Sequence, residues 1–242
     1  MDKGKIIVFE GMDGAGKATQ SLLLKEKMIR EGYNKVTSVT IPAYELTSGK
    51  LIKEYLTTDL YSDRKSYYDI IGASSLYAIN RHQIFYGNNS EVEGYNKLID
   101  LYNDGYTIIC DRYTSSNLLF MAANLFDVEN KHEALLQQVV ASIQLMEYGV
   151  LQIPRPDITI LLSVTPEICY ENLLTRYNGD ASMMDKNENK EMALAVFHTI
   201  KRYSEITGEK SLTFDCVRDS KLMDKISIRD ELYSELLRSE VL

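Results

Sequence analysis

The sequence predicts an α/β fold in which a doubly wound, five-stranded parallel sheet is flanked by helices. Three observations lead to this prediction. Short apolar runs rich in β-branched residues recur along the chain, as expected of strands buried on both faces. Longer segments with helical periodicity separate these runs, which indicates right-handed βαβ crossovers. A glycine-rich turn, GMDGAGK, links the first run to the first helix.

The predicted elements follow in order. Strands are expected at 5–10, 36–41, 107–111, 157–164 and 211–217. Helices are expected at 17–31, 66–86, 91–104, 130–150, 166–177, 188–206 and 227–240. The apolar positions of the 130–150 helix suit either a dimer surface or the core. The polar stretch 176–190 is a candidate lid.

The composition bounds the class of protein. The 242 residues suffice for one domain, which we expect to span 1–242, and no repeat divides them. A formal net charge of −8 with dispersed Lys and Arg argues against a nucleic-acid partner. No apolar run approaches the roughly 18 residues of a membrane span. The first residues also lack a signal-peptide pattern, so we expect a cytoplasmic protein without a membrane partner.

The three cysteines, Cys110, Cys169 and Cys216, lie far apart in the sequence. Each is in or beside an apolar run, and no CxxC pair occurs. An odd number of isolated cysteines argues against both a disulfide framework and a zinc site. We therefore expect buried, unreactive thiols.

The turn after the first strand has the spacing G-x-x-x-x-G-K, from Gly11 to Lys17. Its glycines let consecutive backbone N–H groups face an anion, and the following helix adds the positive end of its dipole. Lys17 would reach the β- and γ-phosphates of a nucleotide. The expected ATP-binding residues are Gly11, Asp13, Gly14, Ala15, Gly16, Lys17, Ala18 and Thr19.

The residue after the lysine departs from the usual pattern. Ala18 stands where a Ser or Thr hydroxyl commonly ligates Mg²⁺, and a methyl group cannot do so. Thr19 is turned by about 100° around the helix, so we do not expect it to substitute. Because Mg²⁺ typically keeps several waters, we expect phosphates, water and a carboxylate to hold it, with Asp13 and Asp111 as candidates.

Other candidate residues follow two later strands, because ligands of a doubly wound sheet lie at the carboxyl ends of its strands. The segments there are PAYE (42–45) and DRYTSSN (111–117). In the second, the arginine fork suits phosphate oxygens and the aspartate suits metal-bound water. The same pair also fits a salt bridge that braces the sheet edge.

Five blocks together resemble the thymidylate kinase family, in order and over nearly the whole chain. They are FEGMDGAGKATQ, IPAY, YAINR (77–81), DRYTSSN and PRPDITILL (154–162). The resemblance implies a nucleoside-monophosphate-kinase fold of the P-loop NTPase type with a short lid. It implies transfer of the γ-phosphoryl group of ATP to dTMP, with Mg²⁺, giving dTDP and ADP. It also implies a homodimer, because family members are commonly dimeric.

The resemblance assigns the acceptor site to nine residues, eight within four of these blocks and Phe120 just after the DRYTSSN block: Asp13, Pro42, Tyr44, Tyr77, Arg81, Arg112, Ser116, Asn117 and Phe120. Tyr77 takes the place of an aromatic residue that stacks on thymine, and Arg81 that of an arginine bound to a thymine carbonyl. Asn117 would face the N3 edge of the base. Arg112 would grip the acceptor phosphate, and Phe120 would crowd the 2′ position and disfavour ribose.

The resemblance also gives catalytic and lid residues. The expected catalytic residues are Asp13, Lys17, Arg112 and Arg176. Asp185 and Glu188 keep the spacing of a family D-x-x-E element, with Lys186 between them. The lid is poor in arginine, and the P-loop has Ala15 rather than arginine. We therefore expect Arg176 or Lys186 to neutralise charge in the transition state.

Two alternatives remain open. The chain could be a kinase for another deoxynucleotide or for a nucleoside, in which case Glu10 is a candidate base for a substrate hydroxyl. It could instead be a nucleotide-binding protein without catalysis. Three departures from the family pattern motivate this reading: Ala18, the arginine-poor lid, and Ala43 where many relatives carry a charged residue.

Overall fold

The computed structural model describes residues 3–58, 60–61, 66–89, 97–125, 132–184 and 188–242. Its centre is a parallel sheet with the strand order β2-β3-β1-β4-β5. The strands are β1 (Lys5–Gly11), β2 (Val36–Thr40), β3 (Thr107–Asp111), β4 (Ile158–Ser163) and β5 (Ser211–Asp215). The predicted fold class is confirmed, and each strand lies within two residues of its expected bounds.

Burial explains why the strands could be recognised. β3 and β4 are buried along their whole length, and β1 is buried at every residue but its first. Such strands read as continuous apolar runs because helices cover both faces of the sheet. Along β1, Ile6 and Val8 pack into one core cluster and Ile7 and Phe9 into another, as the alternation of a strand requires.

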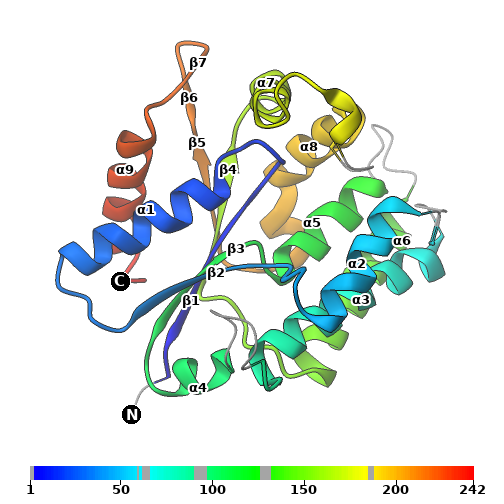
Figure 1. Ribbon diagram of the computed structural model, residues 1–242, viewed down its shortest axis with the longest axis horizontal. Coiled ribbons are helices and arrows are strands. Elements are labelled where there is room, and N and C mark those ends of the chain that lie inside the picture. Colours follow the sequence, from blue (N-terminus) through cyan, green and yellow to red (C-terminus); the bar gives the residue numbers. More distant parts are fainter. Residues whose placement is uncertain (1–2, 59, 62–65, 90–96, 126–131, 185–187) are drawn as a thin grey trace.

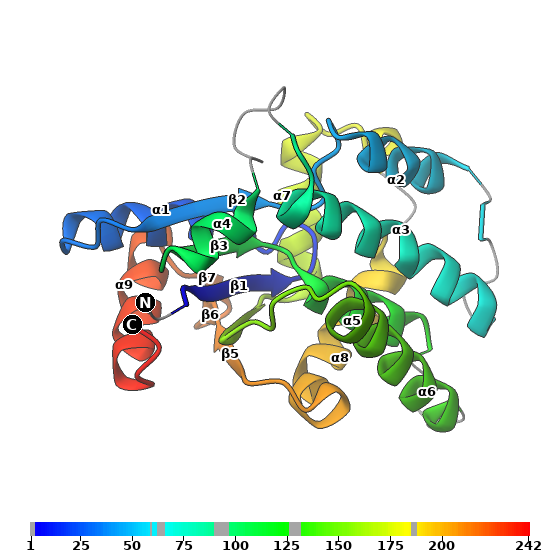
Figure 2. The ribbon, with the colours of Figure 1, turned by 90° about the horizontal axis from the view of Figure 1, so that it is seen from below.

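Helices cover both sides of the sheet. They are α1 (Lys17–Arg30), α2 (Thr47–Thr57), α3 (Tyr67–Tyr86), α4 (Leu98–Asn103), α5 (Thr114–Asn124), α6 (Glu133–Gln144), α7 (Pro166–Arg176), α8 (Lys190–Thr207) and α9 (Lys225–Arg238). Figure 1 shows α1 and α9 on one side and α3, α5, α6 and α8 on the other. The view from below in Figure 2 separates the same two groups. None of the described helices is long and apolar enough to cross a membrane.

Two α-helices of the described residues, α2 and α5, were not predicted. α5 follows the DRY segment directly, and its sequence TSSNLLFMAAN is buried nearly all round, so it shows no amphipathic period. α2 has a glycine in its first turn and threonine at both ends. These residues have low helix propensity, so the segment was interpreted as a loop. A small hairpin of β6 (Val217–Arg218) and β7 (Lys221–Leu222) follows β5 and was also not expected.

The segment expected as one helix over 130–150 is divided. Within the described residues, α6 ends at Gln144 and a π-helical turn, η1 (Leu145–Val150), continues it. Val139 and Ile143 are fully buried in the core of this chain. Of the 91–104 helix, residues 98–103 are helical as α4, and 91–96 lie outside the described residues.

The cysteines are free and buried, as expected. Burial raises the pKa of the Cys169 and Cys216 thiols to about 12. It also raises the pKa of the Cys110 thiol. Because the thiolate is the reactive form, these side chains act as small apolar groups.

Candidate active site

The glycine-rich loop joins the carboxyl end of β1 to the first turn of α1. Gly14 and Gly16 have φ values of 85° and 90°, in the left-handed region that favours glycine. Gly16 is the N-cap of α1 and has no side chain with which to cap this end. The first backbone N–H groups of α1 are therefore available to an anion, as the sequence predicts for a phosphate loop.

The close packing of the loop gives a first test. A Cβ atom added to Gly14 would lie 2.3 Å from the carbonyl oxygen of Cys169, whereas one added to Gly32 would meet nothing within 4 Å. Both glycines have positive φ. Gly32→Ala is expected to lower the free energy of unfolding by about 1–2 kcal/mol, the cost of left-handed backbone. Gly14→Ala is expected to have the same backbone cost and, because its Cβ overpacks against Cys169, a further loss of about 1–3 kcal/mol.

Urea unfolding of the two variants measures the difference, with Gly32→Ala as the matched control for backbone strain alone. Equal losses of stability in the two variants would contradict the close approach of α7 to the loop.

Lys17 lies at the base of the loop. Its Nζ atom donates to the carbonyl oxygens of Gly11 at 3.0 Å and Met12 at 2.8 Å, and it lies 3.6 Å from an Asp13 oxygen. Burial, together with the nearby Arg112, lowers the pKa of the Lys17 ammonium group. The loop therefore holds the lysine beside the α1 N-terminus. Ala18, the next residue, is exposed and offers only a methyl group.

Asp13 and Arg112 form an ion pair that connects the loop to the end of β3. Burial opposes ionisation of Asp13, but Arg112 and Lys17 outweigh it and lower the pKa of this carboxyl group. Arg112 has a φ of 67°, and its backbone N–H donates to Phe9 O at 3.0 Å. Its guanidinium also lies over the Phe120 ring, 5.3 Å from the centroid.

A cavity of about 300 Å³ opens beside this pair. It is lined by Asp13, Ile41, Pro42, Tyr44, Tyr55, Leu56, Tyr77, Arg81, Arg112, Ser116, Asn117, Phe120, Met121, Asn124, Arg176, Tyr177, Glu188 and Met192. All nine residues predicted for the acceptor site are among them. They come from the P-loop, the loop after β2, α3, and the segment from Arg112 through α5, so the fold brings together residues that are far apart in the sequence.

Two of the lining residues, Arg81 and Asn117, belong to a buried ionic cluster. Arg81 donates from Nε to Glu147 Oε2 at 3.0 Å, from Nη2 to Glu147 Oε1, and from Nη1 to Tyr113 O at 3.0 Å. Asn117 donates to the same Glu147 Oε1 at 2.9 Å and to Ser74 O at 3.0 Å. Burial opposes the charge on Arg81, but Glu147 outweighs it and raises the pKa of the guanidinium.

Comparison with known proteins decides the family. The family model described as thymidylate kinase matches residues 9–223. The chain belongs to the thymidylate kinase family. This family consists of ATP-dependent nucleoside-monophosphate kinases whose reaction transfers the γ-phosphoryl group of ATP to dTMP. This chain is accordingly a nucleotide-binding phosphotransferase with ATP as its donor.

Individual relatives that the chain resembles are also thymidylate kinases. The chain is 29% identical over 207 residues to the thymidylate kinase of Caldicellulosiruptor saccharolyticus, a match that covers 84% of each protein. It is 28% identical to that of Schizosaccharomyces pombe, over 88% of this chain and 85% of the relative. A solved thymidylate kinase from Candida albicans has the same fold, with a TM-score of 0.64 at 21% identity, covering 98% of this chain and 93% of the other.

Sequence analysis did not find Asn80, which lies behind the loop that carries Pro42 and Tyr44. Asn80, fully buried on α3, accepts from Ala43 N at 3.0 Å and donates to Ala43 O at 3.1 Å. It also donates to Ser48 Oγ at 3.0 Å. In the sequence, these hydrogen bonds are indicated only by the polar residue that stands between Tyr77 and Arg81. Asn80 fixes the loop after β2, and the Ala43 side chain is buried away from solvent.

Glu147 was also missed. It is fully buried, whereas Met146, the apolar residue before it, is only half-buried. Glu147 follows Ile143 by four residues and Val140 by seven, so it lies on the same face of the helix as these buried residues. An acidic residue at this spacing, within a stretch rich in apolar residues, was the available signal.

The lid side of the cavity contains Arg176 and Glu188. Arg176 ends α7, and its Nη1 lies 3.7 Å from Glu188 Oε1. The Tyr177 hydroxyl donates to Glu188 Oε2 at 2.9 Å. Arg176 also contributes to lowering the pKa of Asp13, and both residues line the cavity. Asp185 and Lys186, the other predicted lid residues, lie outside the described residues.

Glu10, the candidate base of a nucleoside kinase, is not among the residues that line the cavity. Its Oε1 atom accepts from Tyr113 N and Ser115 Oγ, each at 3.2 Å, and from Ser116 Oγ at 2.5 Å. It thereby braces the start of α5. Burial raises the pKa of this carboxyl group against the opposing effects of Arg112 and Lys17.

Proposed function

We propose that this enzyme is a thymidylate kinase whose cavity holds dTMP beside the triphosphate of ATP. One observation carries the proposal: Tyr77, Arg81 and Asn117 line the same cavity as Asp13 and Arg112, at the end of the phosphate loop. An aromatic face, a fork of N–H donors and an amide suit a pyrimidine base, and an arginine suits its phosphate.

The donor triphosphate lies over residues 11–19 in this proposal. Backbone N–H groups of the loop and the N-terminus of α1 bind phosphate oxygens. Lys17 reaches the β- and γ-phosphates from its position at the base of the loop. Ala15, Ala18 and Thr19 contribute backbone only.

The acceptor enters with its base against Tyr77, a stacking contact worth about 1–3 kcal/mol. Arg112 holds the acceptor phosphate in line with the γ-phosphoryl group, beside Pro42, Tyr44 and Ser116. Phe120 fills the space near the 2′ position. An acceptor phosphate is already an anion, so no strong general base is needed. Catalysis then consists of positioning, charge neutralisation by Arg176 and exclusion of water by the lid.

The residues present fit a magnesium ion. Asp111 Oδ1 is buried and has no hydrogen-bond partner among the described residues, and carboxylate oxygen is a ligand that Mg²⁺ accepts. Asp111 and Asp13 would hold the ion, largely through water and the phosphates, since Ala18 provides no hydroxyl. Bound there, Mg²⁺ supplies positive charge to the phosphate oxygens. A homodimer and a cytoplasmic location stay predictions.

The experiment is a panel of acceptors. ADP production from Mg·ATP is measured with dTMP, dUMP, dCMP, dGMP, dAMP, UMP and thymidine, for the natural protein and for Ala18→Ser. We expect turnover that is selective for dTMP in both proteins, because magnesium is held without the missing hydroxyl.

Activity on a different acceptor alone would overturn the assignment of Tyr77, Arg81 and Asn117. ATP binding without turnover of any acceptor would favour the non-catalytic reading, and rescue by Ala18→Ser would then identify Ala18 as the cause.

A further inference from the structure

Pyrimidine bases differ in the hydrogen-bonding pattern of one edge. Thymine and uracil present the O4 acceptor beside the N3–H donor, whereas cytosine presents an amino donor beside the N3 acceptor. A site that tells them apart must present a donor next to an acceptor in a fixed order. An asparagine amide contains both groups and can present either one when it turns over.

In this structure the amide of Asn117 has its orientation fixed. Both protons of its Nδ2 atom are donated to buried acceptors, Ser74 O at 3.0 Å and Glu147 Oε1 at 2.9 Å. A backbone carbonyl and an arginine-paired carboxylate cannot donate in return, so the reversed amide would place its oxygen against two acceptors. The Oδ1 atom is thereby left as the group that Asn117 presents to the cavity.

Arg81 supplies the neighbouring donor. Within the described part of the chain, three of its five N–H groups donate hydrogen bonds: Nε and Nη2 to Glu147, and Nη1 to Tyr113 O. One N–H at each terminal nitrogen has no partner among these described residues, and the side chain lines the cavity. Arg81 Nη2 and Asn117 Nδ2 share Glu147 Oε1, so the donor and the acceptor lie side by side.

We propose that Glu147 is the positioning residue that makes the pocket select thymine or uracil over cytosine, by fixing the Asn117 amide and the Arg81 guanidinium around one carboxylate. The inference rests on the proposed function, because it concerns the base of the same acceptor. Glu147 does not line the cavity and touches the base only through these two side chains.

Glu147→Gln tests the proposal. The glutamine keeps the shape of the side chain but places an NH₂ group where the carboxylate had only acceptors. The variant removes one of the two acceptors that fix the Asn117 amide and leaves only Ser74 O to hold its orientation. We expect the ratio of kcat/KM for dTMP to kcat/KM for dCMP, at saturating Mg·ATP, to fall by about tenfold or more.

Glu209→Gln is the matched control. Glu209 is also buried and accepts from two hydroxyl groups, those of Tyr148 and Tyr203, each at 2.6 Å. It is not among the residues that line the cavity. The same chemical change there is expected to lower the melting temperature and leave the dTMP to dCMP ratio unchanged.

A purely structural role for Glu147 predicts that the variant loses kcat/KM for both nucleotides by the same factor, and that result overturns the proposal. If Glu147→Gln shows no cooperative melting transition, the ratio is measured on Glu147→Asp, which keeps the negative charge beside Arg81 but shortens the reach of the carboxylate toward Asn117. A fall in the ratio supports the proposal, and an unchanged ratio overturns it.

Turnover of dTMP and dCMP by the natural protein distinguishes a failure of this proposal from a failure of the proposed function. If it turns over dTMP without preferring it to dCMP, the inference about Glu147 fails while the kinase activity stands. If it turns over no acceptor, the proposed function fails first, before any substitution is compared.

Discussion

Lys17→Met is expected to reduce kcat by about 10²–10³, the usual cost of removing one preorganised group that stabilises transition-state charge. The substitution keeps the length and apolar stem of the side chain and removes its charge. Lys17 is buried against the loop, with its Nζ held by Gly11 O and Met12 O. The measurement is ADP release at saturating Mg·ATP and dTMP, with the melting temperature as a check on folding.

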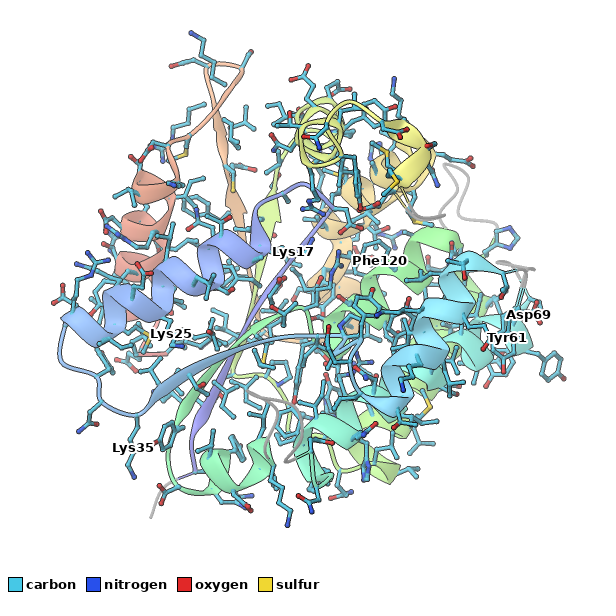
Figure 3. All side chains as sticks on the ribbon, in the orientation of Figure 1. Lys17, Lys25, Lys35, Tyr61, Asp69 and Phe120 are labelled. Atoms are coloured by element: carbon cyan, nitrogen blue, oxygen red, sulfur yellow. The ribbon has the colours of Figure 1, made fainter. Side chains whose placement is uncertain are left out.

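Lys25→Met is the matched control. Lys25 lies on the same helix, about two turns further along α1 and away from the loop (Figure 3). We expect its kcat to stay within about twofold of the natural value, as for a surface substitution away from the site. A kcat for Lys17→Met that matches this control would refute the role of the phosphate loop in the reaction.

Glu147→Leu is expected to have the largest effect on stability, a loss of about 3–5 kcal/mol in the free energy of unfolding. Arg81 is 1% exposed and Glu147 is fully buried, so the variant leaves a charged guanidinium in the core with no carboxylate. Urea unfolding followed by circular dichroism measures the loss. The size of the effect comes from the unpaired charge and not from the attraction of the pair.

The double variant Arg81→Met/Glu147→Leu separates these two causes. Replacing a buried ion pair with apolar residues is often close to neutral, so we expect the double variant to be more stable than Glu147→Leu alone. It is also expected to lose selectivity for dTMP, because both the donor and the orientation of Asn117 are gone. Additive losses of stability would mean that the two side chains are not coupled in the folded protein.

Local sequence patterns were sufficient to predict the strands of the sheet. β1, β3 and β4 are buried on both faces, and this environment requires continuous apolar runs that are visible in the sequence. The phosphate loop was visible for a similar reason, since left-handed backbone at Gly14 and Gly16 demands glycine at fixed spacing. Helix α5 was missed because total burial removes the periodicity on which helix prediction depends.

The site could be predicted in part. The nine acceptor residues came from resemblance to the family, and the structure places all of them around one cavity, while their individual roles stay predictions. Asn80 and Glu147 were not found. Each acts through hydrogen bonds to residues far away in the chain, Asn80 to Ala43 and Glu147 to Arg81 and Asn117.

The sequence by itself determined the strand positions, the phosphate loop and the family, because each depends on residues that are close together or on motifs in a fixed order. Only the tertiary structure decided what lies behind Arg81 and Asn117 in the wall of the cavity. Arg81 and Glu147 are 66 residues apart, and they meet only because α3 packs on α6 and η1. Glu147 is fully buried within η1, and a buried carboxylate has to find its hydrogen-bond donors within the protein.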